Sequence, residues 1–149
     1  SRGLGDVYKR QALCGINVQQ LGGELAVHEA KHNLPDGSIK IVALINAPVG
    51  VLQAASFIKS SPRLIALAWD AQSLAKALHA QGDSETLHHA RSIVVMAARS
   101  AGVLAFDSAT PELTNQALRR ACTEARRNGF DGKLAVDLAQ QALIEEAFA

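Results

Sequence analysis

The chain has 149 residues, a formal net charge of +1 at pH 7 and a hydrophobic fraction of 48%. This length fits one domain or a piece of a larger one, and the apolar fraction is enough to build a core. Aromatic residues make up 4%, and no basic run is interleaved with them, so no nucleic-acid partner is expected. No apolar stretch reaches the roughly eighteen residues of a membrane-spanning helix, so no membrane association is expected.

The first eleven residues, SRGLGDVYKRQ, differ from the rest because they are basic, contain glycine and show no periodicity. They resemble a translated adapter sequence that recurs at the ends of reading frames from shotgun assemblies. We therefore expect residues 1–11 to be a non-native leader and residues 12–149 to form one domain. The leader is excluded from the fold prediction, and the natural chain is expected to have been cut before Ala12.

The two cysteines favour a cytoplasmic protein. Cys14 and Cys122 lack metal-ligand spacing and are interpreted as reduced core or helix residues. The first residues also lack the charged-then-apolar build of a signal peptide.

From Ala12 onward, helical and strand patterns alternate. Residues 16–32 place apolar side chains at helical spacing, and the segment NLPDG then predicts a turn. Residues 39–47 (IKIVALINA) form a continuous apolar and β-branched run, which is typical of a strand buried on both faces. The same patterns predict strands over 63–69, 103–107 and 133–137, and helices over 49–60, 71–82, 84–102, 111–129 and 138–149.

Strands that alternate with helices predict an α/β fold with a parallel sheet. About four such units are too few to close an eight-stranded barrel, and a cut barrel would leave strand edges unpaired. The pattern therefore predicts a fragment, and its open edges predict either aggregation or pairing with another copy as a homo-oligomer.

Three segments carry a family resemblance: INAPVGVLQAASFIKSSPRLIALAWDAQSLAKAL, ARSIVVMAARSAGVLAFD and NGFDGKLAVDLAQQALIEEAF. They resemble the citrate lyase beta-chain-like group of the HpcH/HpaI aldolase superfamily, which has I-E-T-A-x-G-V-L-N-A, S-P-R, G-A-E-D-L-A and G-F-x-G-K at the corresponding places. The resemblance spans roughly residues 20–149 in register. It implies a partial TIM (β/α)8 barrel, with about four βα units that correspond to strands five to eight.

The resemblance also implies a carbon–carbon lyase that acts on a CoA- or acyl-carrier-thioester hydroxyacid with magnesium. However, Asn46 and Ser73 stand where the family has its two metal-ligand carboxylates. Magnesium prefers anionic oxygens, so neutral ligands would weaken its binding by roughly several kcal/mol. Asp70 lies in the same loop and is a candidate replacement ligand. Two hypotheses follow: an active lyase, or a catalytically degenerate relative that serves as a binding or structural subunit.

Asp107 ends a predicted strand at the edge where barrels keep function, and it matches a family aspartate, so it is a tentative catalytic residue. Asp137 is expected at the same edge, at the end of the last strand. Arg63 and Lys133 begin predicted strands, which places them at the opposite edge and indicates structural roles. The arginine pairs at 119–120 and 126–127 are predicted to form a solvated basic helix face, with contact to a CoA phosphate as the alternative.

Residues 28–32 read HEAKH, the H-E-x-x-H pattern of zinc peptidases. On a helix, His28 and His32 would share one face, and Glu29 could activate a zinc-bound water. The next glutamate after Glu29 is Glu85, which is too distant to predict a third ligand. The pattern is therefore interpreted as an exposed helix face, and zinc hydrolysis is a third hypothesis.

Overall fold

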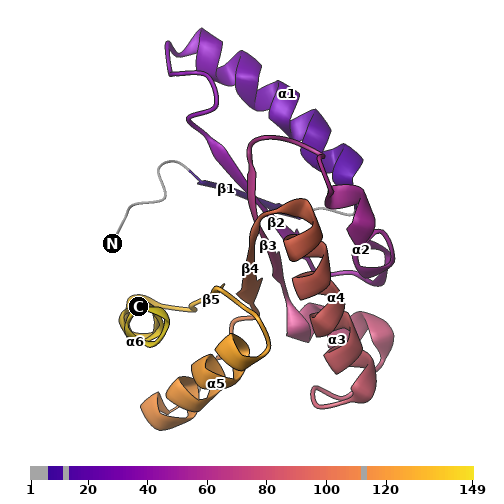
Figure 1. Ribbon diagram of the computed structural model, residues 1–149, viewed down its shortest axis with the longest axis vertical. Helices are drawn as coiled ribbons and strands as arrows, with labels where there is room; N and C mark the ends of the chain where they lie inside the picture. The colour runs from indigo at the N-terminus through magenta and orange to yellow at the C-terminus, as the bar shows by residue number, and fades with distance from the viewer. Residues whose placement is uncertain (1–6, 12–13, 112–113) are drawn as a thin grey trace.

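The computed structural model describes residues 7–11, 14–111 and 114–149, and its centre is one sheet of parallel strands (Figure 1). The strands are β1 (Val7–Gln11), β2 (Lys40–Ile45), β3 (Leu64–Trp69), β4 (Leu104–Asp107) and β5 (Gly132–Lys133). Their order in the sheet is their order in the sequence, and each neighbouring pair is parallel. The prediction of an α/β fold with a parallel sheet is confirmed.

Helices connect the strands. They are α1 (Gly15–Lys31), α2 (Pro48–Leu52), the 3-10 helix η1 (Ala54–Phe57), α3 (Ala71–Leu78), α4 (Glu85–Ala101), α5 (Asn115–Arg127) and α6 (Leu138–Phe148). The predicted capping residues bound α4 at its two ends. At the start, the Ser84 side chain accepts a hydrogen bond from the Leu87 amide, and at the end Gly102 adopts the left-handed conformation. None of the helices in the described ranges is long and apolar enough to cross a membrane.

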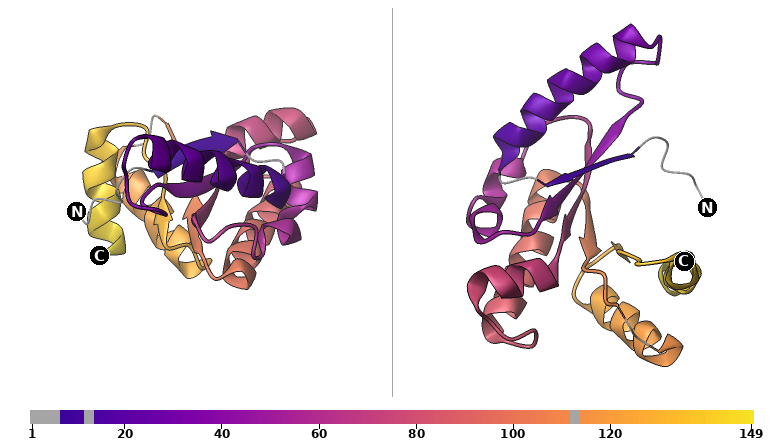
Figure 2. Two further views of the ribbon diagram at one scale, coloured as in Figure 1. Left: turned by 90° about the horizontal axis from the view of Figure 1, so that it is seen from above. Right: turned by 180° about the vertical axis from the view of Figure 1, so that it is seen from behind.

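The helices α1 to α4 lie along one side of the twisted sheet, whereas α5 and α6 lie beyond β4 and β5 (Figures 1 and 2). The main core lies between the sheet and the first group of helices, and its fully buried side chains include Ile41, Ile45, Phe57, Leu67 and Leu74. A smaller cluster joins α5 to α6.

The other face of the sheet carries a second apolar cluster. Val42, Ala66 and Ala68 are buried there, and Phe106 and Leu134 are partly buried against them. A groove of about 610 Å³ runs along this face between β5 and α6, with Val42, Phe106 and Leu134 in its wall. β2 and β3 therefore present apolar side chains on both faces, as their continuous apolar runs predict.

Three elements differ from the prediction. β1 lies within the segment that was excluded as a leader, so it adds a strand that was not predicted; the non-native origin of residues 1–11 stays a prediction. The segment predicted as one helix over 49–60 is divided into α2 and η1. Lys59, two residues after η1, has a φ of 57°, which is outside the helical range. The strand predicted over 133–137 is only Gly132–Lys133, which pairs with β4.

Candidate functional site

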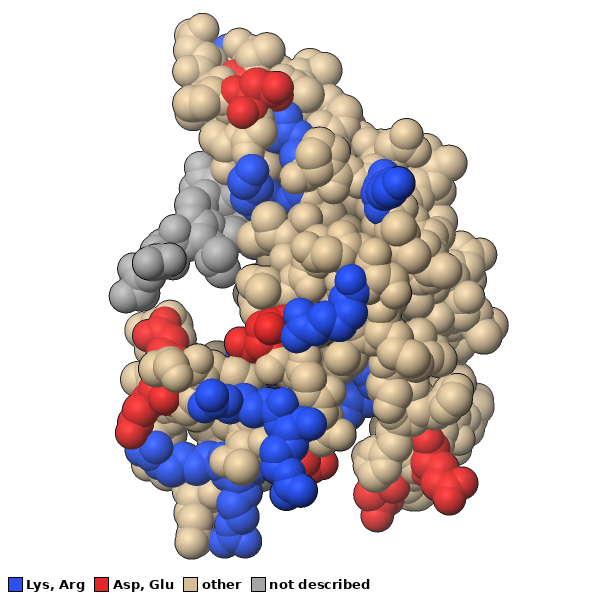
Figure 3. All heavy atoms as spheres, viewed as in Figure 1, with Lys and Arg blue, Asp and Glu red and all other residues tan. Residues whose placement is uncertain are grey.

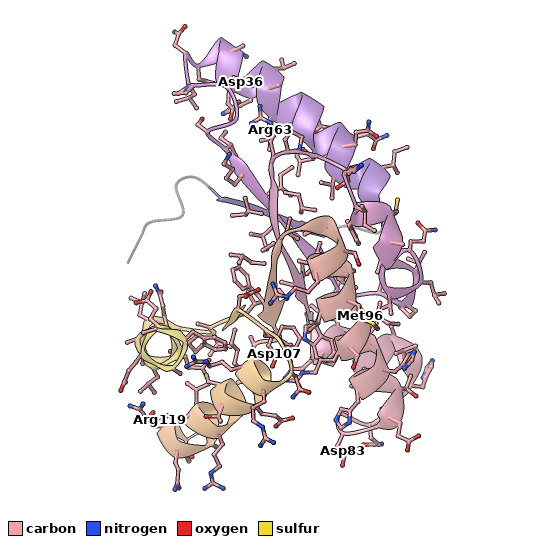
Figure 4. All side chains as sticks on the ribbon, viewed as in Figure 1. Asp36, Arg63, Asp83, Met96, Asp107 and Arg119 are labelled. Carbon is pink, nitrogen blue, oxygen red and sulfur yellow. The ribbon has the colours of Figure 1, made fainter. Side chains whose placement is uncertain are left out.

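The carboxyl ends of β2, β3 and β4 meet at one edge of the sheet. Ile45 pairs with Trp69, and the Asp70 amide donates to the Ile45 carbonyl at 3.0 Å, so Asn46 and Asp70 follow two neighbouring strand ends. Asp107 ends the next strand. In Figure 4, Asp107 lies at this end of the sheet and Arg63 at the other. The structure therefore brings three of the predicted site positions to one edge, as the sequence pattern predicts.

Asp70 is the N-cap of α3. One carboxylate oxygen accepts a hydrogen bond from the Ser73 amide at 3.1 Å, and the other accepts from the Ser73 hydroxyl at 2.8 Å. Each Asp70 oxygen therefore accepts one hydrogen bond from Ser73. This contact satisfies a free amide of the first helical turn and places negative charge at the positive end of the helix.

The donors at this corner do not assemble a magnesium site. Magnesium needs several hard oxygens around a space that also holds water, and carboxylates are its usual protein ligands. Asn46 Oδ1 is buried and has no hydrogen-bond partner in the described structure, so it does not face open solvent. Among Asn46, Asp70 and Ser73, only Asp70 has a carboxylate. No group of three histidine, cysteine, aspartate or glutamate side chains among the described residues is arranged to hold a metal ion.

Asp107 is the centre of a buried hydrogen-bond network. Its Oδ1 accepts from the Trp69 indole at 2.8 Å, from the Ser108 amide at 3.0 Å and from Arg91 Nε at 3.2 Å. Its Oδ2 accepts from Arg91 Nη2 at 2.8 Å, and Lys133 Nζ lies 3.7 Å away. Each carboxylate oxygen is therefore engaged by a cation, and the network joins α4 to the ends of β3, β4 and β5.

The charges in this network shift one another's pKa values. Burial by itself raises the pKa of Asp107, but the Arg91 hydrogen bond and the positive charge of Lys133 outweigh it and hold that pKa below its ordinary value. Burial lowers the pKa of Lys133, against the opposing attraction of Asp107. Burial also raises the pKa of the Cys122 thiol. Asp107 is thus an ionised acceptor at neutral pH.

Two predicted positions are wrong. Lys133 pairs with Asp107 across the sheet, so it lies at the carboxyl edge of β4 and not at the opposite edge. The reason is stagger, because β5 begins beside Phe106, near the end of β4. Asp137 does not end a strand: it caps α6 by accepting from the Gln140 amide at 2.8 Å.

The opposite edge of the sheet contains a second buried ion pair. Arg63 donates to both carboxylate oxygens of Glu29, each at 2.7 Å, and also to Asp36 at 2.8 Å. Glu29 further accepts from the amides of Gly37 and Ile39. The Arg63 hydrogen bond, reinforced by these amides against the effect of burial, lowers the pKa of Glu29 to about 2. This network joins the end of α1 to the starts of β2 and β3, so the structural role predicted for Arg63 is confirmed.

The same network excludes the zinc interpretation of HEAKH. His28 and His32 are exposed as predicted, with ring centroids 4.4 Å apart, but Glu29 is only 1% exposed. The expectation that Glu29 lies on an exposed face is therefore wrong. Its carboxylate is held by Arg63 and cannot serve as a base beside the histidines.

The sequence did not reveal the roles of Glu29, Trp69 and Ser108. The Ser108 hydroxyl accepts from the Ala71 amide at 2.9 Å and so joins the end of β4 to the start of α3. Two consecutive polar residues at a strand end, here Asp107 and Ser108, are the sequence signal that could have indicated this contact between β4 and α3. Cys14 and Cys122 are free thiols, as predicted.

Comparisons with known proteins identify relatives. Residues 13–137 match the family model of HpcH/HpaI aldolase/citrate lyase. The chain is 32% identical over 116 residues to citrate lyase subunit beta of Escherichia coli K12, a match that covers 76% of this chain and 38% of that protein. It is 29% identical over 137 residues to (3S)-malyl-CoA thioesterase of Cereibacter sphaeroides, covering 90% of this chain and 47% of that protein. The chain thus spans less than half the length of these curated relatives.

Solved structures share the fold. RipC from Yersinia pestis superposes with a TM-score of 0.81 at 21% identity, over 97% of this chain and 64% of that one. The citrate lyase beta subunit from Mycobacterium tuberculosis, complexed with oxaloacetate and magnesium, superposes with a TM-score of 0.73 at 20% identity, over 95% of this chain and 60% of that one.

Proposed function

Because the chain belongs to the HpcH/HpaI aldolase/citrate lyase family, we propose that it forms part of a TIM (β/α)8 barrel, with β2 to β5 as strands five to eight. The parallel strands in sequential order and the helices along one side support this proposal. In a closed barrel, the second apolar face, with Val42 and Phe106, would point to the interior.

The ligand that we propose is a CoA- or acyl-carrier thioester of a hydroxyacid. The support is membership of the family together with similarity to a citrate lyase subunit and to a malyl-CoA thioesterase. The binding site would lie at the carboxyl edge of the strands, near Asn46, Asp70 and Ser108, because barrels bind substrates at that edge.

For this chain we propose a catalytically degenerate role, in which it serves as a binding or structural subunit. The observation that carries this proposal is the double hydrogen bond from Ser73 to the Asp70 carboxylate. These bonds hold the Asp70 carboxylate in the cap of α3, beside the positions where the family has its two metal ligands. A family lyase uses its metal to stabilise the developing enolate oxygen, and Asn46 and Ser73 offer no charge for that purpose.

The second candidate is an active carbon–carbon lyase that uses magnesium. Family membership favours it, and Asp70 is the residue that it requires as replacement ligand. Asp70 would have to leave both Ser73 contacts, at the expense of the α3 cap. In either case we propose that Asp107 positions the ends of β3 and β4, and does not exchange protons, because every oxygen of its carboxylate already accepts hydrogen bonds.

A thioester assay on the intact protein tests these alternatives. We expect saturable binding of malyl-CoA without magnesium-dependent cleavage. The double variant Asn46→Glu with Ser73→Asp restores the family carboxylates, and any gain of cleavage should appear there alone. Cleavage by the unaltered protein that is lost in Asp70→Asn would instead establish the lyase.

We also propose a cytoplasmic location and assembly with further copies of the chain. The two free thiols support the location, because cytoplasmic proteins keep cysteines reduced. For the 149-residue chain by itself, the apolar groove beside β5, which a closed barrel would turn inward, supports assembly.

A further inference from the structure

The α5 and α6 helices form a hollow lined by arginine on the outer surface. It has a volume of about 450 Å³, and its lining consists of Arg119, Thr123, Arg126, Arg127 and Ala147. Figure 3 shows Lys and Arg side chains gathered over this part of the molecule, at the lower left. Three of these five residues are arginines, so the hollow is suited to an anion.

Two of the guanidinium groups are held in place by α6. Arg119 Nη2 donates to Glu146 at 2.9 Å, and Arg126 Nη1 donates to the Ala147 carbonyl at 2.7 Å. A guanidinium has five N–H donors, so each keeps most of its donors after this single printed bond. These exposed hydrogen bonds restrict the two side chains, so a ligand that binds them loses somewhat less conformational entropy on binding.

The third guanidinium, that of Arg127, makes no hydrogen bond or ion pair with any residue in the described ranges. The Thr123 hydroxyl donates to the Arg119 carbonyl, so the donors left for a ligand are guanidinium N–H groups. Guanidinium forks match the oxygens of a phosphate in pairs.

The charge of the hollow fits a doubly charged anion. Three arginines face it, and Glu146, which is paired with Arg119, is the acidic side chain bound at its rim. Two positive charges therefore remain. A phosphate monoester carries roughly −1.5 to −2 at pH 7, which neutralises them. A single carboxylate would leave one of them uncompensated.

We propose that this hollow binds a phosphate monoester group, with Arg126 and Arg127 as its main donors and Arg119 completing the site. The site lies on the outer helices and does not depend on the thioester function proposed above.

Calorimetric titration of the intact protein with glycerol 3-phosphate and, separately, with inorganic phosphate tests the proposal. We expect one saturable site. Arg127→Gln should weaken binding about tenfold, because it removes a charge-assisted pair of hydrogen bonds. Arg120→Gln is the matched control: it removes the same charge from the same helix, but Arg120 does not line the hollow, so binding should change less than about twofold.

Binding of both compounds would mean that the phosphate alone is recognised, and binding of the ester alone would mean that its organic part contributes. Either result supports the proposal. It is overturned if neither compound saturates, or if Arg120→Gln weakens binding as much as Arg127→Gln does. Equal melting temperatures for the two variants would verify that both remain folded.

Discussion

Glu29 is a charged residue that holds the fold together at the amino edge of the sheet. Its carboxylate accepts hydrogen bonds from Arg63 and from the amides of Gly37 and Ile39, which belong to the chain that enters β2. These contacts compensate for the loss of water around a group that is 1% exposed. Asp36, the other partner of Arg63, is exposed, so we expect it to contribute less.

The lowered pKa of Glu29 predicts a specific acid sensitivity. The pKa is about 2 in the folded protein and 4.5 ordinarily, so the unfolded chain binds the proton first as the pH falls. The stabilisation is complete above about pH 4.5 and is lost progressively toward pH 2. In urea unfolding measured from pH 6 to pH 3, Glu29→Gln should therefore show a smaller fall in stability below pH 4.5 than the unaltered protein does. Asp83→Asn, at an exposed residue, is the control and should keep the original pH profile.

The Asp107 network predicts a large loss of stability on truncation. Asp107→Ala leaves the buried Lys133 ammonium, 3% exposed, and the Arg91 guanidinium without their carboxylate. Breaking a buried pair in this way costs about 3 kcal/mol. Glu146→Ala breaks the exposed pair with Arg119 and should cost less than about 1 kcal/mol. Urea midpoints compare the two variants, and equal losses would contradict the role assigned to Asp107.

At the scale of elements, two glycines of α1 have opposite surroundings. A Cβ built on Gly15 would lie 1.8 Å from the Ser56 carbonyl oxygen, whereas one on Gly23 would meet nothing within 4 Å. The close approach lets the Gly15 amide donate to the Ser56 hydroxyl at 2.7 Å, which fixes the start of α1 against η1. Gly15 is thus required by packing, while Gly23 only lowers helix propensity.

Alanine substitution should therefore change stability in opposite directions. Gly23→Ala should raise the free energy of unfolding by up to about 1 kcal/mol, because alanine favours the helix. Gly15→Ala should lower it, because backbone must move to admit the methyl group. Thermal melts of the two variants test this pair, and stabilisation by Gly15→Ala would show that α1 does not pack against η1 as described.

The elements were predictable to the extent that their signals are local. The apolar runs of β2, β3 and β4 and the capping residues of α4 are readable within a few positions, and they were assigned correctly. The division of the segment 49–60 into α2 and η1 was not predicted, because it depends on how this segment packs against α1 and α4. The shortness of β5 was missed because strand length depends on partners that a single segment does not show.

The candidate site was predictable in position but not in its contacts. Asn46, Asp70 and Asp107 were placed at one edge because parallel strands end together. The partners of the two buried carboxylates were missed because they are distant in sequence: 38 residues separate Trp69 from Asp107, and 34 separate Glu29 from Arg63. Nothing in a local pattern distinguishes such a buried charge from a solvated one.

At the scale of the whole molecule, the groove between β5 and α6 predicts self-association. It exposes apolar side chains of the second sheet face, and β5 has an open edge among the described strands. By light scattering, the 149-residue chain should therefore form dimers or larger species. Leu134→Lys, in the groove, should weaken association at least about tenfold. Leu52→Lys, at an exposed position on α2 outside the groove, should leave it unchanged. A monomer at all concentrations would contradict the prediction.

We propose that this member of the HpcH/HpaI aldolase/citrate lyase family does not bind magnesium at Asn46 and Ser73. The most direct test is calorimetric titration of the intact protein with magnesium, beside Asp70→Asn and the double variant Asn46→Glu with Ser73→Asp. We predict no binding heat for the unaltered protein or for Asp70→Asn, and measurable binding once the two carboxylates are restored. Magnesium binding by the unaltered protein that disappears in Asp70→Asn would contradict this proposal and show that Asp70 has replaced the lost ligands.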